Sequence, residues 1–215
     1  KSNIDTEIPL KKEPMVNVAI LGGAFNPITL GHIQIAMYVL SACSLFNEIW
    51  IMPCYKHIYS KKMAESDHRL EMCRLAALID DRIKVSDYEI KNRFEGGTYY
   101  LLKQLLDEDF IKNHFHCSLI IGQDNANTFN KWVKHKELKQ LIRFIVIPRQ
   151  GVKRDTSIDW YLTSPHIFLD ADSPIMEVSS TQVRNLLQKQ DYNQAGNLLD
   201  PAVLSYIKKH NLYCS

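Results

Sequence analysis

Residues 16–32, VNVAILGGAFNPITLGH, decide the fold. The segment begins with a short apolar run, 16–21, of the kind that forms buried β-strands. Gly22 and Gly23 end that run, and from His32 onward apolar residues recur at helical spacing. The segment is therefore predicted to form a strand, a glycine-rich turn and a helix that begins near His32.

The same alternation of apolar runs and helical patterns continues along the chain. Further strands are predicted at residues 49–53, 83–85, 118–121, 143–147 and 167–169. Further helices are predicted at residues 66–79, 99–106, 179–188 and 202–210. Strands that alternate with helices indicate βαβ units, so an α/β fold with a doubly wound, mostly parallel, Rossmann-like sheet is expected. Ligands bind such sheets beyond the carboxyl ends of the strands.

The composition is that of an ordinary globular chain. Its 215 residues are 46% hydrophobic and 23% charged, which suits one domain. Residues 1–14 are expected to form a loose N-terminal tail, and residues 15–215 a single domain that is helical from about residue 179. A net charge of +2 gives no electrostatic argument for nucleic-acid binding. No apolar stretch approaches the roughly 20 residues that a membrane span needs.

The five cysteines are widely spaced and form no CxxC pair, which argues against a disulfide framework and a structural zinc site. A reducing compartment, the cytoplasm, is therefore expected, and the nucleus stays open as an alternative. The sequence leaves the oligomeric state open, with a homo-oligomer as one outcome.

The glycine-rich turn has the properties of a phosphate-binding site. Gly22 and Gly23 let backbone N–H groups approach a bulky anion, because no Cβ stands in the way. The positive end of the following helix faces the same place. A histidine at that helix start, His32, can donate a ring N–H to a phosphoryl oxygen.

The residues from Gly22 to His32 resemble the signature G-G-x-F-[DN]-P-x-[HT]-x-G-H of the HxGH nucleotidyltransferase superfamily. The Asn-Pro-Ile-Thr version is most similar to the nicotinamide and nicotinate mononucleotide adenylyltransferases. The resemblance implies that His32 contacts the α-phosphate of ATP and that Asn26 belongs to the mononucleotide site. Thr29 stands where other members have histidine, and its hydroxyl can bond a phosphate oxygen. The residues of this motif that the resemblance assigns to ATP are Gly22, Gly23, Ala24, Phe25, Thr29 and His32.

A second motif, VSSTQVR at residues 178–184, suits a polyphosphate. Ser179 or Ser180 can cap a helix and leave backbone donors for an anion, and the fork of Arg184 lies one turn further on. The string resembles the second superfamily signature, I-S-S-T-x-[IV]-R. The resemblance implies that Ser179, Ser180 and Arg184 bind ATP, with Arg184 beside His32 as the catalytic pair.

A third segment, IIGQDN at residues 120–125, places a glycine and an acid at a strand end. Gly122 allows close approach of a ribose, and the carboxylate of Asp124 can accept from its hydroxyls. The segment resembles the I-I-G-x-D string of nicotinate mononucleotide adenylyltransferases, which implies that both residues bind ATP. In the same family an aromatic ring at the position of Trp132 stacks on the pyridine ring.

Other resemblances concern the mononucleotide. The string YSKK at residues 59–62 is similar to a eukaryotic mononucleotide loop, which implies that Lys61 and Lys62 neutralise phosphate charge. His68, after this loop, is expected to be structural. The resemblance further assigns Thr98, Tyr99 and Arg149 to the mononucleotide.

The reaction that this resemblance implies joins ATP and nicotinate mononucleotide into nicotinate adenine dinucleotide and pyrophosphate, a step of NAD biosynthesis. The acceptor phosphate is already anionic at neutral pH, so catalysis needs positioning and charge stabilisation rather than a strong base. The chain shows no Asp/Glu cluster that would cage a metal, so Mg²⁺ is expected to be carried on the ATP phosphates.

Three alternatives stay open. The IIGQD segment favours nicotinate, but the NPIT and YSKK strings are similar to eukaryotic members, in which nicotinamide mononucleotide also serves as acceptor. A sister enzyme such as phosphopantetheine adenylyltransferase shares the first signature. A non-catalytic nucleotide-binding regulatory module could use the same fold, although His32 and Arg184 favour an enzyme.

Overall fold

The computed structural model describes residues 14–56, 63–170, 175 and 178–215 of the chain. A six-stranded sheet forms its centre, in the order β3-β2-β1-β4-β5-β6, and every neighbouring pair is parallel. This arrangement confirms the predicted α/β fold. The strands are β1 (Val16–Gly23), β2 (Glu48–Pro53), β3 (Ile83–Val85), β4 (Phe115–Gly122), β5 (Arg143–Ile147) and β6 (Ile167–Phe168).

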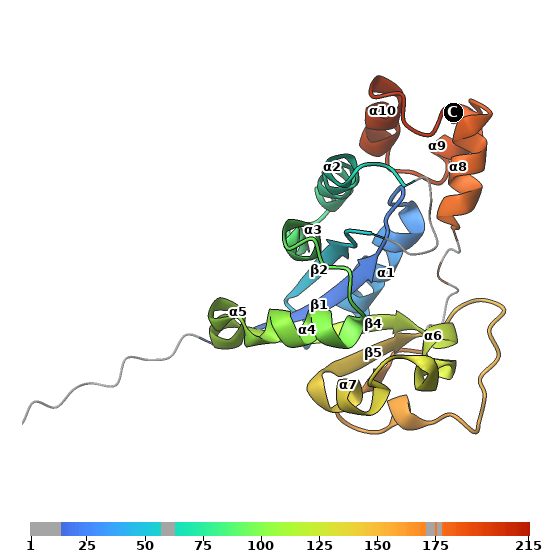
Figure 1. Ribbon diagram of the computed structural model, residues 1–215. Helices are drawn as coiled ribbons and strands as arrows, with labels where there is room; N and C mark the ends of the chain where they lie inside the picture. The colour runs from blue at the N-terminus through green and yellow to red at the C-terminus, as the bar shows by residue number, and fades with distance from the viewer. Residues whose placement is uncertain (1–13, 57–62, 171–174, 176–177) are drawn as a thin grey trace, which may run out of the picture.

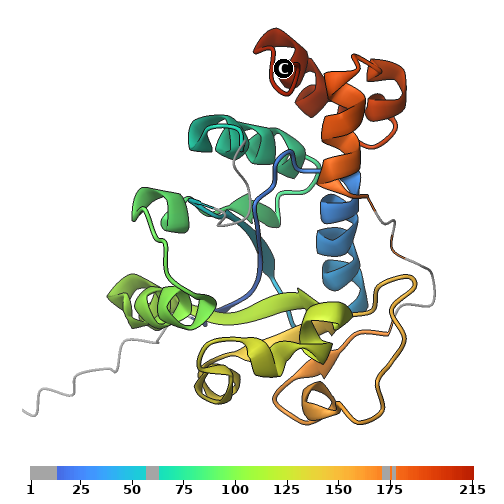
Figure 2. The same ribbon diagram turned by 45° about the vertical axis from the view of Figure 1, so that its right-hand side comes forward.

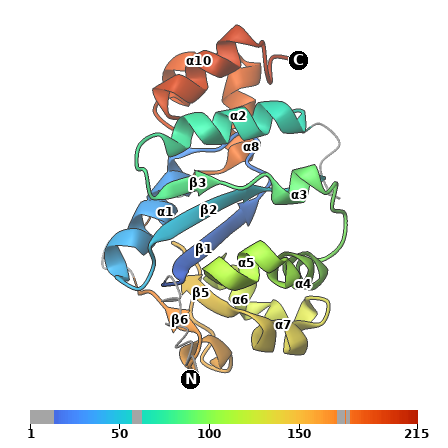
Figure 3. The same cartoon turned by 90° about the vertical axis from the view of Figure 1, so that its left-hand side faces the viewer.

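Helices cover both faces of the sheet. Figure 3 shows α2, α8 and α10 on one side of strands β1–β3, and α4, α5 and α7 on the other. The helices are α1 (Leu30–Ala42), α2 (Ser66–Ala77), α3 (Tyr88–Lys91), α4 (Thr98–Asp107), α5 (Asp109–His114), α6 (Gln123–Asn127), α7 (His135–Leu141), α8 (Ser180–Gln188), α9 (Tyr192–Gly196) and α10 (Pro201–Lys209), with the 3₁₀ turns η1 (Phe129–Lys131) and η2 (Trp160–Leu162).

The apolar run of β1 serves two cores, because successive side chains of a strand point to opposite faces. Ala19 and Leu21 belong to one core, together with buried residues of α1, α2, α8 and α10. Val18 and Ile20 belong to the other, together with buried residues of α4, α7 and β5. A strand that is buried on both faces reads as a continuous apolar run, which is the pattern that predicted β1.

The C-terminal helices pack onto the same core as the sheet. Val183 of α8 and Ile207 of α10 are fully buried against residues of α1 and α2, and Figure 1 shows α8–α10 gathered beside α2. His68 of α2 and Tyr206 of α10 lie 2.7 Å apart, from Nδ1 to Oη. His68 is therefore structural, as predicted.

The strand order reverses at β1 and β4. The chain leaves β1 for the helices of one face, whereas the segment that leads into β4 covers the other face. At such a switch point the two connections diverge and leave a crevice beyond the carboxyl ends of the strands. The motif residues from Gly22 and Gly122 onward emerge at this crevice.

Several boundaries differ from the predicted ones. Helix α1 begins at Leu30 with Thr29 as its N-cap, and β4 begins at Phe115, three residues before the predicted start. The short helices α3, α5, α6, α7 and α9 were not predicted. Each has at most seven residues, which is two turns or less and too short for a helical period to show in the sequence.

None of the described helices is long and apolar enough to span a membrane. All five cysteines, each within the described ranges, are free thiols.

Candidate active site

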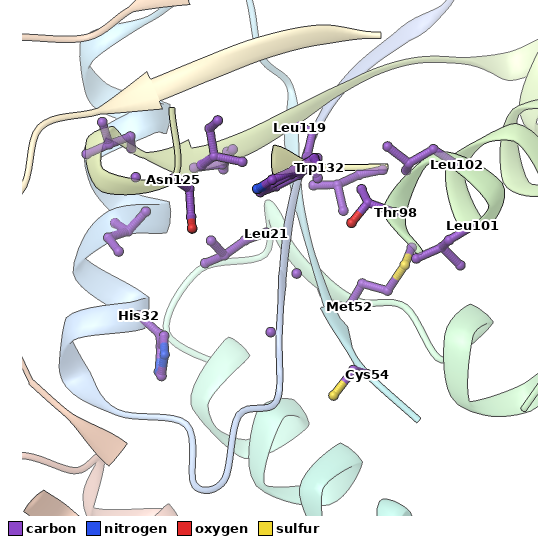
Figure 4. Close-up of a pocket in the computed structure, with 18 of the residues that line it drawn as sticks. Leu21, His32, Met52, Cys54, Thr98, Leu101, Leu102, Leu119, Asn125 and Trp132 are labelled. Carbon is purple, nitrogen blue, oxygen red and sulfur yellow. The ribbon is translucent and has the colours of Figure 1, made fainter. Parts of the chain in front are cut away.

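A cavity of about 530 Å³ lies beyond the carboxyl ends of β1, β2, β4 and β5, at the switch point. Figure 4 shows His32 and Asn125 on one side of it, Met52 and Thr98 on the other, and Trp132 between them. The predicted site residues that line the cavity are Gly22, Gly23, His32, Thr98, Gly122, Trp132 and Arg149.

His32 lies in the first turn of α1, and contacts with its neighbours hold its ring in place. The backbone N–H of Thr29 donates to Nδ1 at 2.9 Å, and Thr29 Oγ1 lies 3.2 Å from the same atom. The ring packs edge-on against Phe25, with centroids 4.9 Å apart. The signature residues around His32 therefore set both the position and the rotation of the imidazole.

These surroundings also determine the protonation state of His32. Burial, and secondarily the charge of Arg149, lower the pKa of His32 to about 4, so the ring is neutral at pH 7. Because Nδ1 accepts the Thr29 N–H, the single proton of the neutral ring lies on Nε2. The ring that lines the cavity thus offers an uncharged N–H donor.

The signature loop, which we define as residues 24–29, precedes His32, and its residues are not among the described residues that line the cavity. Asn26 is 3% exposed. Its Oδ1 accepts from the Ala64 N–H at 3.0 Å and from the Tyr213 hydroxyl at 2.7 Å. In the part of the chain that the structure describes, the loop residues Ala24, Phe25, Asn26 and Thr29 do not line the cavity. Their direct contacts with nucleotides stay predictions, and the observed contacts indicate a positioning role.

The second motif is bonded to the signature loop. Ser179 caps α8 by accepting from the Gln182 N–H. Ser180 Oγ donates to the Pro27 carbonyl at 2.9 Å, and Arg184 Nη1 donates to the Asn26 carbonyl at 2.8 Å. Figure 2 shows the resulting closeness of the start of α8, in orange, to the start of α1, in blue.

The described structure therefore places Arg184 behind the loop that carries His32. Its Nη2 also donates to Thr181 Oγ1 at 3.0 Å. Ser179, Ser180 and Arg184 are not part of the cavity wall that the described residues form. Their contact with ATP stays a prediction.

At the end of β4, Gly122 makes room for two charged side chains. Asp124 Oδ2 and Arg149 Nη1 form an ion pair at 3.1 Å. A Cβ at Gly122 would lie 2.6 Å from Asp124 Oδ1 and 2.9 Å from Arg149 Cδ, which is too close for any side chain. Asp124 Oδ1 is buried and has no hydrogen-bond partner among the described residues. Asp124 is not among the described residues that line the cavity, so its contact with the ribose stays a prediction.

On the opposite side of the cavity, Thr98 opens α4 and Trp132 follows η1. Both line the cavity, whereas Tyr99 is not one of its described lining residues and lies 5.0 Å from the ammonium of Lys134. Lys61 and Lys62 lie outside the described residues.

Comparison with known proteins agrees with this geometry. The model of the cytidylyltransferase-like family matches residues 20–186. A Streptococcus mutans protein named "Probable nicotinate-nucleotide adenylyltransferase" is 31% identical, over 99% of this chain and 95% of its own length. An Oceanobacillus iheyensis protein of the same name is 34% identical, over 93% and 97%. The chain belongs to the nicotinate-nucleotide adenylyltransferase family.

Solved structures support the same assignment for this adenylyltransferase. The nicotinic acid mononucleotide adenylyltransferase of Plasmodium falciparum, complexed with NaAD, matches with a TM-score of 0.76 and 25% identity. The match covers 92% of this chain and 97% of that one. The chain is thus a nucleotidyltransferase, as the two signature strings predicted.

Sequence reasoning missed a buried cation of this adenylyltransferase, Arg69 of α2. It is 1% exposed, and its guanidinium donates to the carbonyls of Ala24, Cys54, Tyr55 and Ala64. It joins the signature loop to residues 54–55, which follow β2, and to Ala64, which precedes α2. The sequence does contain a signal for this buried arginine, because Arg69 occupies a position on the apolar face of the predicted helix.

Glu89 of α3 was missed as well, although it lines the cavity. Burial raises the pKa of Glu89 to about 7, and the charge of Arg69 opposes part of that rise. Nothing in the local sequence marks this acid among its polar neighbours. Among the described residues, no group of three His, Cys, Asp or Glu side chains could hold a metal ion.

Proposed function

We propose that this enzyme transfers the adenylyl group of ATP to the phosphate of nicotinate mononucleotide. The products are nicotinate adenine dinucleotide and pyrophosphate. The observation that carries the proposal is a neutral, oriented His32 in a switch-point cavity that also holds Trp132. The names of the relatives, and the NaAD bound in the Plasmodium falciparum structure, support the choice of acceptor.

The two substrates are assigned to opposite sides of the cavity. Adenosine is assigned to the end of β4 near Gly122, which lines the cavity, with the carboxylate of Asp124 as the proposed acceptor for a ribose hydroxyl. The pyridine ring lies against Trp132, because a large aromatic face suits a flat ring. The Trp132 ring also favours this acceptor over phosphopantetheine, which has no ring to stack.

The chemistry needs no side-chain nucleophile. An oxygen of the acceptor phosphate attacks the α-phosphorus of ATP, and the bond from that phosphorus to the pyrophosphate oxygen breaks. The Nε2–H of His32 and the N-terminus of α1 stabilise the α-phosphoryl oxygens while their charge develops. Because His32 is neutral, it acts as a hydrogen-bond donor rather than as an acid.

Arg184 is assigned to the leaving pyrophosphate. A guanidinium carries five N–H donors, and the bonds to Asn26 and Thr181 use two of them. The remaining donors can bind the polyphosphate. Mg²⁺ is proposed to enter with ATP, held by phosphates and water, where it neutralises charge on the leaving group.

Substitution of His32 tests this proposal. We expect His32→Ala to lower kcat for dinucleotide formation by about 10²- to 10³-fold, which is typical when one oriented transition-state donor is lost. His116→Ala is the matched control, because His116 is exposed near the amino end of β4 and lines a separate groove. Near wild-type kcat in His32→Ala, measured by pyrophosphate release, would remove His32 from the mechanism.

A further inference from the structure

Glu89 is a half-buried acid on the acceptor side of the cavity. It belongs to α3, which packs against β2, and it lines the cavity together with Met52, Thr98 and Leu101. Its surroundings are mostly apolar, so its carboxylate loses hydration there. A carboxylate in such a position costs folding free energy unless another group compensates its charge.

Among the described residues, little compensates the charge of Glu89. None of the ion pairs between described residues includes Glu89. Arg69 is the nearby cation that acts on Glu89, but its donors are taken by backbone carbonyls and by Ser66 Oγ. Cys54, after β2, is the other titratable group whose charge couples to Glu89.

The charges of the cavity are divided between its two sides. Among the described lining residues, Glu89 is the single carboxylate and Arg149 the single Lys or Arg. Arg149 lies after β5, where it pairs with Asp124. Glu89 belongs to α3, which packs against β2, and so lies toward the side of Met52 and Thr98; Thr98 is one of the residues assigned to the mononucleotide. The acceptor ring is an N-alkylpyridinium, so its ring nitrogen carries a positive charge, opposite in sign to the carboxylate of Glu89.

We propose that Glu89 is a specificity-determining residue that recognises the positive charge of the acceptor's pyridinium ring. The inference rests on the proposed function, because it needs a mononucleotide acceptor in this cavity. Glu89 attracts the cation from one direction while Trp132 offers its ring face. A mononucleotide with an uncharged base lacks this attraction and binds less well.

The pH dependence follows from the same arrangement. The pKa of Glu89 is raised to about 7 in the free enzyme, so the carboxylate is protonated at pH 6 and ionised at pH 8. Attraction to a pyridinium is therefore weak at pH 6 and present at pH 8. Both Arg69 and Cys54 keep their charge state over this range: Arg69 is a guanidinium, and burial raises the pKa of the Cys54 thiol further above neutrality.

The test compares Glu89→Gln with the wild type on two acceptors, nicotinate mononucleotide and its 1,4-dihydro form, whose ring is neutral. At pH 8 we expect Glu89→Gln to lower kcat/KM for the pyridinium acceptor by about five- to tenfold through KM, consistent with one partly solvated charge pair. At pH 6, and with the dihydro acceptor at either pH, the two enzymes should differ less than twofold. Glu95→Gln is the control, because Glu95 pairs with Lys56 at the surface and does not line the cavity.

An equal loss with both acceptors would overturn the proposal and point to a contact with the ribose, which both acceptors carry. A loss that is the same at pH 6 and pH 8 would overturn it in favour of a packing role. The failure of the proposed function would look different, because the wild type itself would then form no dinucleotide from either acceptor.

Discussion

His32 shows how much one side chain depends on its immediate contacts. The Thr29 N–H fixes Nδ1 as an acceptor, and burial keeps the ring uncharged. Thr29 occupies a position where related signatures have a second histidine, and in this chain it orients the one imidazole that remains. The motif could be predicted from the sequence, but the neutral state of His32 could not, because it follows from burial and from Arg149 at a distance of 117 residues along the chain.

The lowered pKa of His32 predicts how the stability of the folded protein depends on pH. Its pKa in the folded protein is about 4, against an ordinary value of 6.5. The folded state therefore binds fewer protons than the unfolded state between these values, so the stability contributed by a neutral His32 is present above pH 6.5 and is lost as pH falls toward 4. An NMR titration of the imidazole should show a midpoint near 4. A midpoint between 6 and 7 would contradict the assignment of a neutral donor with a strongly lowered pKa.

Arg69 and Glu89 show which of the missed residues could be found from the sequence and which could not. An arginine on the apolar face of a predicted helix is a visible irregularity, and a search for such positions would find Arg69. Glu89 lies in a short polar segment, and only the packing of α3 against β2 brings it to the cavity. Its role therefore depends on tertiary structure rather than on any local pattern.

The elements around the signature loop form one bonded unit. Asn26 accepts from Ala64 after β2 and from Tyr213 at the C-terminal end, and its carbonyl accepts from Arg184 of α8. Segments that are distant in sequence thus meet behind the phosphate site. The sequence predicted each long element by its apolar period, but it could not predict these cross-links, because they pair polar atoms of separate segments.

Removal of one cross-link should weaken the unit. Tyr213→Phe deletes the hydroxyl that donates to Asn26 Oδ1, while the Ala64 N–H still satisfies that oxygen. We expect the free energy of unfolding to fall by about 1 kcal/mol, the usual contribution of one hydrogen bond. Urea denaturation measures this, with the exposed Tyr100→Phe as control. A Tyr213→Phe protein as stable as the wild type would show that this bond does not hold the C-terminal segment.

For the whole molecule, the sheet order determines where the site lies. The reversal at β1 and β4 opens the cavity, and the motifs at residues 22–32 and 120–125 leave the sheet at that point. The alternation of strands and helices predicted a doubly wound sheet with its site at the carboxyl ends of the strands, because right-handed crossovers leave few topologies. The strand order, and with it the point of reversal, was not predicted. The single-domain organisation stays a prediction, and the oligomeric state stays open.

The central claim is that this molecule joins ATP to nicotinate mononucleotide. The most direct measurement compares kcat/KM for nicotinate mononucleotide, nicotinamide mononucleotide and phosphopantetheine at saturating ATP, by pyrophosphate release and product identification. We expect the highest value for nicotinate mononucleotide, with nicotinate adenine dinucleotide as product. A higher value for phosphopantetheine, or no pyrophosphate with either mononucleotide, would contradict it.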